Sequence, residues 1–422
     1  MTKLFFFFPY DEECGVPMLW LRMSRWVAEH YGNEFDCYVV DYPDGAMARN
    51  ITEADKVKVL EYTEKYGCTI EDDAIIIFQS FRPCFWPENL RLSPKTKVFW
   101  WTLHVRCLAP VLIPEPAAEL TFKYNWLYKL CSLFYWDFMH RFAKLVDDMI
   151  ARDALVFMDT PTFDGGVTHL PMKTKTIDRF LPVPAPDYDG VLKNKRAQGE
   201  LNVCWLGRLS DEKTPILKYT IRKLSEYALK HQQKITMHVL GWGEYQNEVD
   251  NLGLENEYYC QLKTKPIKST EINSFLLQNI DLMFAMGTSA LEAAKLGVPT
   301  VLMDAAYEEI KGDYIFTPLF ERTGYELAHL ITKADIEAGN TSFERIMDLA
   351  NNHFQDFSQK SRDYFVRNHA LSTVGEQFVG LLRKLDFTFD EIDPKVMEPL
   401  KIWEIWLSLK KRMTERSVNR KI

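Results

Sequence analysis

The chain has 422 residues, 47% of them hydrophobic and 14% aromatic, so we expect a globular protein with two hydrophobic cores. Its formal net charge of −8 argues against a general nucleic-acid-binding protein. The eight cysteines are scattered singly, without the spacing of a zinc site or a redox motif. The apolar run at residues 4–8 is too short for a signal peptide, and no stretch approaches the length of a membrane span. We therefore expect a cytoplasmic protein.

The first half of the chain alternates between predicted strands and helices. Strands are expected at residues 3–8, 35–41, 74–79, 97–102 and 154–158. Helices are expected at residues 18–30, 56–65 and 138–152, with a long aromatic insertion at residues 108–139. Strands that alternate with crossover helices predict a parallel sheet of Rossmann type.

A proline-rich segment at residues 181–186 then interrupts the pattern, because it cannot continue a helix or a central strand. Beyond it, strands are expected at residues 201–206, 235–240, 258–261, 280–285 and 300–303. Helices are expected at residues 214–230, 245–252, 270–278, 289–296 and 341–382, and a last one at 395–416. The fold class is thus α/β, with one Rossmann-like domain at residues 1–184, a second at residues 185–372, and a C-terminal segment at residues 373–422.

The turn after the predicted strand 280–285 is a candidate anion site. Gly287, Thr288 and Ser289 lie at the carboxyl end of a strand and at the start of a short helix, where free N–H groups and the helix dipole suit a diphosphate. We expect Thr288 or Ser289 to cap this helix and Gly297 to end it. Glu292, one turn further, has a carboxylate that can accept hydrogen bonds from a sugar. Such turns also occur without a ligand, so both readings are open.

Two cations follow the predicted strand 201–206. Arg208 offers a planar fork for phosphate oxygens, and Lys213 offers a mobile point charge. Cleavage of a sugar–phosphate bond leaves a diphosphate whose negative charge grows in the transition state, and two cations aimed at it lower the barrier. No Asp-x-Asp motif indicates a metal–diphosphate site, and we expect no metal or other cofactor. The alternative is that Lys213 is merely solvated at a helix start.

Residues 200 to 305 resemble the retaining family 4 of GT-B glycosyltransferases, which use sugar nucleotides. Three stretches carry the resemblance: Gly207–Lys213, Gly241-Trp242-Gly243, and residues 281–299. In that family the arginine and lysine matching Arg208 and Lys213 bind the donor diphosphate, and the Gly-x-Gly turn lies beside the base. The glutamate matching Glu292 holds the donor ribose.

The resemblance implies a GT-B fold, in which two Rossmann-like domains face a cleft and a C-terminal helix returns to the first domain. The implied catalytic residues are Arg208, Lys213 and His104, a histidine at a strand end in the first domain. The alternative for His104 is a histidine tied to a neighbouring loop. The implied donor-binding residues are Gly207, Gly241, Gly243, Gly287, Thr288, Ser289 and Glu292. The family signature carries a second glutamate eight positions before Glu292, where this chain has Phe284, so retention and inversion at the sugar carbon both stay open.

The implied function is the transfer of a sugar from a nucleoside-diphosphate sugar to a polysaccharide or lipid-linked acceptor. Asp11 and Glu12 in the first loop are weaker candidates for acceptor contact. The alternatives are a catalytically silent sugar-nucleotide-binding subunit, and a GT-B epimerase or hydrolase, for which no carboxylate pair is evident.

Two stretches suggest attachment to the inner face of a membrane. The insertion at residues 108–139 interleaves aromatic and basic side chains, although it equally fits a helical pair packed on the first domain. Residues 395–422 contain eight Lys or Arg against three Glu, a net charge of +5 that an anionic surface would attract. Trp403 and Trp406 in this tail fit either membrane insertion or packing on the first domain.

Overall fold

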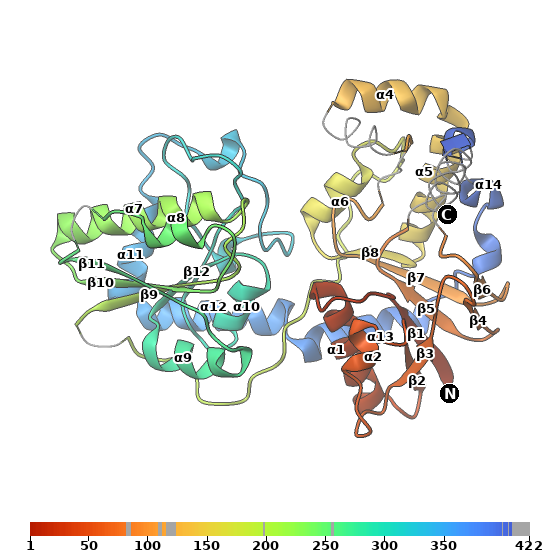
Figure 1. Cartoon of the computed structure of the whole chain (residues 1–422), viewed down its shortest axis with the longest axis horizontal. Coiled ribbons are helices and arrows are strands. Elements are labelled where there is room, and N and C mark those ends of the chain that lie inside the picture. Colours follow the sequence, from red (N-terminus) through yellow and green to blue (C-terminus); the bar gives the residue numbers. More distant parts are fainter. Residues whose placement is uncertain are drawn as a thin grey trace, which may run out of the picture. The chain divides into compact units, whose positions relative to one another are not determined.

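The computed structural model describes residues 1–81, 86–108, 112–114, 124–196, 199–254, 257–398, 400–403 and 405–406. It divides into two compact units (Figure 1). The first unit comprises Met1–Leu181 together with Gly375–Ile422, and the second comprises Pro182–Val374. The chain thus leaves the first unit three residues before the expected boundary and re-enters it two residues after the expected one.

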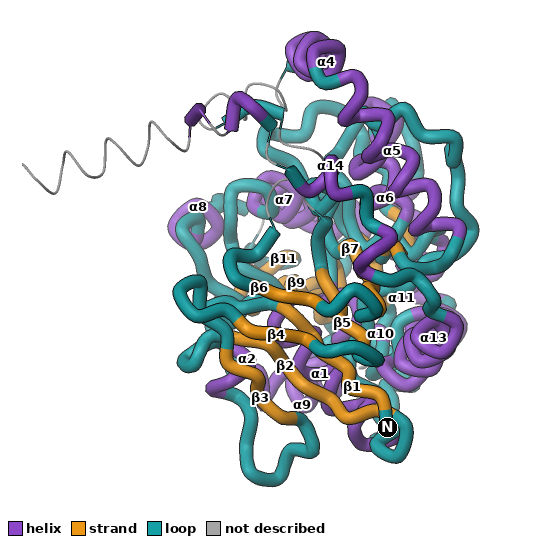
Figure 2. The backbone as a smooth tube through the Cα atoms, turned by 90° about the vertical axis from the view of Figure 1, so that its right-hand side faces the viewer, coloured by secondary structure: helices purple, strands orange, loops and turns teal. Residues whose placement is uncertain are grey.

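The first unit is built on a six-stranded parallel sheet with the order β3-β2-β1-β5-β7-β8 (Figures 1 and 2). Its strands are β1 (Thr2–Phe7), β2 (Phe35–Asp41), β3 (Lys58–Glu61), β5 (Ile75–Phe78), β7 (Lys97–Thr102) and β8 (Leu155–Phe157). A separate pair is formed by β4 (Cys68–Ile70) and β6 (Leu90–Leu92). The helices are α1 (Gly15–His30), α2 (Ala46–Arg49), α4 (Asn125–Phe134), α5 (Trp136–Ala151) and α6 (Thr160–Val167).

The helix expected at residues 56–65 is wrong, because β3 occupies part of this stretch. Val57 and Val59 alternate with lysines, a period-two pattern with β-branched residues that favours a strand. Pairing with β2, in the register Tyr38↔Lys58 to Asp41↔Glu61, places this strand at the edge of the sheet.

The second unit repeats the arrangement, with the strand order β11-β10-β9-β12-β13-β14. The strands are β9 (Leu201–Leu206), β10 (Ile235–Leu240), β11 (Cys260–Lys265), β12 (Leu282–Ala285), β13 (Thr300–Leu302) and β14 (Thr317–Pro318), of which only β14 is antiparallel to its neighbour. The helices are α7 (Thr214–His231), α8 (Gln246–Asp250), α9 (Ile272–Asn279), α10 (Thr288–Ala294), α11 (Ser342–Asn352) and α12 (Phe354–Asn368). Short 3-10 helices lie at Ser269–Glu271, Leu319–Glu321, Lys333–Asp335 and, in the first unit, Phe389–Glu391.

The helix α13 (Leu371–Lys384) begins in the second unit and ends in the first. Its Phe378 packs against Phe6, Phe99 and Trp101 of the first unit, with ring centroids 5.8 to 5.9 Å apart. The expected return of a C-terminal helix to the first domain is confirmed.

The last predicted helix does not run unbroken from residue 395. The helix α14 (Pro394–Met397) ends at Glu398, whose backbone is extended, and helical residues follow at 401–403 and 405–406. Trp403 is buried, and its ring lies edge-on to that of Trp406. The cations at 410–412 lie outside the described residues. No helix in the described part of the chain is long and apolar enough to cross a membrane.

Candidate functional site

Three turns of the second unit meet at one edge of its sheet. β9 pairs with β10 on one side and with β12 on the other, with Trp205 opposite both Val239 and Phe284. The loop 207–213 and the turns 241–243 and 287–289, which follow these three strands, therefore emerge together. Because the strand order reverses between β9 and β12, this edge is where doubly wound sheets bind ligands.

Glycines allow the backbones of the first two of these turns to pack closely against each other. A Cβ atom at Gly241 would lie 2.0 Å from the carbonyl oxygen of Gly207, and one at Gly243 would lie 2.1 Å from that of Leu209. The N–H of Leu209 donates to the carbonyl of Trp242 at 3.1 Å. Gly241 and Gly243 therefore allow a close backbone approach that any side chain would block.

Arg208 and Lys213 lie on the loop that these glycines hold. Arg208 is exposed and Lys213 half-buried, and neither forms an ion pair within the described residues. Burial is the main cause that lowers the pKa of Lys213; the charge of Glu212 opposes this, and the charge of Arg208 adds to it. Two neighbouring cations repel each other, so an anion bound between them would be stabilised.

The N-terminal end of α7 lacks a side-chain cap. Lys213 occupies the N-cap position, and Thr214 is the first helical residue. The hydroxyl of Thr214 instead donates to the carbonyl of Ser210 at 2.8 Å. A cation at a helix start opposes the dipole unless an anion joins it, which again favours an anion at this loop.

The turn after β12 differs from the prediction in its cap. Gly287 is the N-cap residue of α10, and neither Thr288 nor Ser289 caps the helix with its side chain. The φ of +63° and ψ of −146° at Gly287 belong to a region that only glycine adopts readily. The N–H groups of Thr288 and Ser289 have no acceptor among the residues that the structure describes.

Glu292 lies on α10 and forms an ion pair with Lys295. The Lys295 side chain is only 5% exposed and that of Glu292 is 27% exposed, so the pair is largely buried. One carboxylate oxygen of Glu292 is thus engaged within the protein. This ion pair was not predicted from the sequence, although the i to i+3 spacing of the two residues on a helix was a usable signal.

Phe284, which stands where the family has a glutamate, is fully buried. Its ring packs against Phe316 and Phe343, with centroids 5.8 and 6.4 Å away. The residue is part of the core beneath the sheet, and it presents no polar group to a ligand.

His104, Asp11 and Glu12 belong to the first unit and are exposed. The Nδ1 atom of His104 accepts a hydrogen bond from the backbone N–H of Arg106 at 3.1 Å, so the neutral ring carries its proton on Nε2. The structure brings the other predicted site residues together in the second unit.

Comparisons with known proteins show the fold. No protein-family model and no curated protein matches the chain. Among solved structures, a glycosyltransferase from Rickettsia africae ESF-5 has a TM-score of 0.52 at 9% identity, covering 91% of this chain and 98% of that one. The lipopolysaccharide outer core galactosyltransferase WaaB has a TM-score of 0.49 at 10% identity, covering 91% of this chain and 99% of that one. Anabaena HepE in complex with UDP-glucose has a TM-score of 0.44 at 13% identity, covering 91% of this chain and 100% of that one. The predicted GT-B fold is confirmed.

Proposed function

We propose that this protein is a glycosyltransferase whose nucleoside-diphosphate sugar binds at the second unit. The observation that carries the proposal is the pair of cations, Arg208 and Lys213, which form no ion pair within the described residues and lie beside a turn with open N–H groups. All of these groups lie where the strand order reverses. They suit a diphosphate with its oxygens between the two cations and the turn.

The proposed chemistry is stabilisation of the leaving group. As the bond from the sugar carbon to the phosphate oxygen breaks, its electron pair moves onto the diphosphate. Arg208 and Lys213 neutralise that charge, and the N–H groups of Thr288 and Ser289 donate to it. These residues perform the role that a divalent cation has in other diphosphate sites, so we propose metal-independent transfer.

The proposed contacts with the donor sugar and ribose rest on the resemblance to family 4 of the GT-B glycosyltransferases. Glu292 accepts hydrogen bonds from the ribose with the carboxylate oxygen that Lys295 leaves available. His104 donates from Nε2 to the transferred sugar. We propose that the sugar keeps its anomeric configuration, which NMR of the product tests directly.

A glycan or a lipid-linked glycan is the proposed acceptor, presented at a membrane surface. The support comes from α4, where Trp126, Leu130, Leu133 and Phe134 share one face and are 44% to 80% exposed. The opposite face is used for packing, since Tyr128 is buried and stacks on His169. An exposed apolar helix face of this kind suits insertion into the headgroup region of a bilayer.

The buried Phe284 favours one second candidate, a sugar-nucleotide-binding subunit without catalysis. Incubation with a panel of sugar nucleotides, with and without glycan acceptors, separates the candidates. Acceptor-dependent release of nucleoside diphosphate supports the transferase. Binding without release indicates the silent subunit, and release that ignores the acceptor indicates a hydrolase.

A further inference from the structure

Asp304 is a fully buried carboxylate that follows β13. Its Oδ2 atom accepts hydrogen bonds from the hydroxyl of Tyr314, at 2.6 Å, and from the guanidinium of Arg322. Its Oδ1 atom accepts from the backbone N–H of His329 at 3.2 Å. A carboxylate without such partners would be costly to bury, so this group fixes the segments that surround it.

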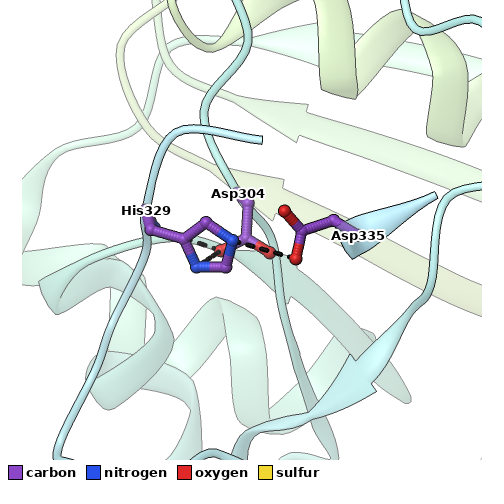
Figure 3. A group of neighbouring side chains, drawn as sticks. All are labelled: Asp304, His329 and Asp335. Carbon is purple, nitrogen blue, oxygen red and sulfur yellow. Dashed lines mark hydrogen bonds and ion pairs between the residues drawn. The ribbon is translucent and has the colours of Figure 1, made fainter. Parts of the chain in front are cut away.

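The ring of His329 lies among three carboxylates (Figure 3 shows two of them). Its Nδ1 atom contacts Glu326 and lies 3.3 Å from Oδ1 of Asp304, and its Nε2 atom lies 3.0 Å from Oδ1 of Asp335. Both ring nitrogens donate only when the imidazole is protonated. The bond to Glu326 is the main cause that raises the pKa of His329 to about 9, so the ring is a cation at neutral pH.

A metal ion is the alternative occupant of this cluster, because one ligand atom from each of Asp304, His329 and Asp335 lies within 4.8 Å of the others. The donors are already engaged, however. Arg322 forms ion pairs with Asp304 and with Glu326, and its Nη1 atom lies 3.4 Å from Nδ1 of His329. The raised pKa of His329 favours the protonated ring at neutral pH. A metal needs a neutral imidazole, so the protonated ring acts here as the central cation.

The segment that contains His329 is joined to the donor-binding turn. The carbonyl of Leu327, two residues before the histidine, accepts a hydrogen bond from the N–H of Gly287 at 2.8 Å. Gly287 is the residue whose unusual backbone conformation opens the N–H groups of α10. The position of residue 327 therefore influences the orientation of that turn.

The same segment is joined to the loop that carries the two cations. The carbonyl of His329 accepts from the N–H of Ala305 at 2.7 Å, and the next residue, Ala306, donates to the carbonyl of Glu212 at 2.9 Å. Glu212 directly precedes Lys213. Both halves of the proposed diphosphate site are thus hydrogen-bonded to residues beside this ion network.

We propose that His329 is a positioning residue for donor binding, which holds the Gly287 turn and the Lys213 loop in the geometry that a diphosphate requires. The inference rests on the proposed function. Neutralisation of His329 removes the cation that faces Asp335 and leaves Arg322 alone to balance Asp304 and Glu326. Repulsion among the three carboxylates therefore grows, so the segment relaxes and the affinity for the diphosphate falls.

The direction of the pH dependence follows from the raised pKa. The folded value, about 9, lies above the ordinary value of 6.5. The stabilisation is therefore complete below pH 6.5 and is lost as the pH rises through the folded value. Arg322 stays charged over this range. Tyr314 stays neutral, because burial and the charge of Asp304 raise the pKa of its hydroxyl. Neither residue therefore explains the loss of affinity. The pKa of Lys213 is lowered by burial, so its charge also depends on pH, and only a comparison of variants at each pH isolates His329.

The experiment measures binding of UDP, GDP and ADP to the full chain by calorimetry, between about pH 7.5 and about pH 10. At the lower pH, His329→Gln should weaken the best-bound diphosphate by about tenfold, within the usual range of coupling between two sites. The ratio of the two affinities should approach one at the upper pH. His238→Gln is the matched control, because His238 lies on β10 with a pKa lowered to about 4 and is neutral throughout.

A second variant tests the role of charge in a protein that keeps its histidine. Asp335→Asn removes one carboxylate partner, so the pKa of His329 falls and the alkaline loss of affinity should begin at lower pH. If His329→Gln does not fold, this shift in the pH profile by itself tests whether the charge of His329 supports diphosphate binding. A merely structural histidine would lower the melting temperature in both variants without moving the pH profile.

The outcomes separate the two proposals. If the wild-type chain binds none of the three diphosphates, the proposed function fails, and this inference fails with it. If the wild type binds but the affinity ratio for His329→Gln is constant across the pH range, only the inference fails. An increase in wild-type melting temperature with Zn²⁺ that His329→Gln abolishes would show a metal site and would also overturn it.

Discussion

Arg208 and Lys213 are the residues on which the proposed donor site depends. Replacement of either by alanine removes charge-assisted hydrogen bonds to the diphosphate and should weaken its binding by roughly 1.5–3 kcal/mol. Arg222→Ala is the matched control, because this exposed arginine of α7 forms its one ion pair within the described part of the chain with Glu309, on the protein surface. Titration calorimetry with nucleoside diphosphates measures the effect. Equal affinities for all four proteins would contradict the assignment.

The ion pair between Glu292 and Lys295 makes it possible to test a structural role of Glu292 separately from a role in donor binding. Glu292→Gln leaves the buried Lys295 without its carboxylate and should cost about 3 kcal/mol of stability, the lower end for breaking a buried pair. In the double variant Glu292→Gln with Lys295→Met, the unpaired charge is gone and much of the stability should return. Donor affinity should stay low in both variants if Glu292 holds the ribose. Recovery of affinity together with melting temperature would make the glutamate purely structural.

Among the elements, the paired loops after β9 and β10 are sensitive to the addition of a single methyl group. Gly243→Ala places a methyl group 2.1 Å from a backbone oxygen of Leu209, so the loop that carries Arg208 must move. We expect a loss of at least about 2 kcal/mol in stability or in diphosphate binding. Gly253→Ala is the control, because nothing lies within 4 Å of the added Cβ. Melting curves and calorimetry on both variants test this, and indistinguishable behaviour would refute it.

Sequence patterns predicted the elements whose local signals agree with their tertiary surroundings. β9, with the bounds Leu201–Leu206, and β10, with the bounds Ile235–Leu240, match the expected ranges, because a stretch made mostly of apolar residues suits a strand that is largely buried on both faces. The edge strand β3 was missed although its alternating valines and lysines favour a strand, because this signal spans only four residues and the pairing with β2 is needed to decide it. The cap of α10 was missed as well, because it depends on a backbone conformation that no residue pattern encodes.

The site was predictable only where its residues follow a strand directly. Arg208, Lys213 and Gly287 come at fixed distances after apolar runs, which places them at one sheet edge. The network around His329 joins residues far apart in the sequence, from Asp304 to Asp335, with no motif spacing. Only the folded chain brings their charges together.

For the whole molecule, the exposed face of α4 and the basic tail together predict reversible attachment to anionic membranes. A Lys or Arg near such a surface contributes on the order of 1 kcal/mol, and salt screens the attraction. Co-sedimentation with anionic liposomes should therefore fall with added salt. It should also fall in a Trp126→Ser/Phe134→Ser variant and in a Lys410/Lys411/Arg412→Glu variant, both of normal melting temperature. A wild-type protein that ignores anionic liposomes at low salt would contradict the proposal.

The route of the chain between the two units constrains how the protein is made. The outgoing and returning segments are joined within the second unit, where Ala185 and Ala370 pair in parallel and Asp187 binds Ser372. The first unit lacks Phe378, and with it one wall of its aromatic core, until synthesis has passed α13. On the ribosome the second unit is thus the earlier one with a complete core, although it is encoded later. Until then the aromatic residues of the N-terminal sheet stay exposed, and we expect chaperones to bind the nascent chain there.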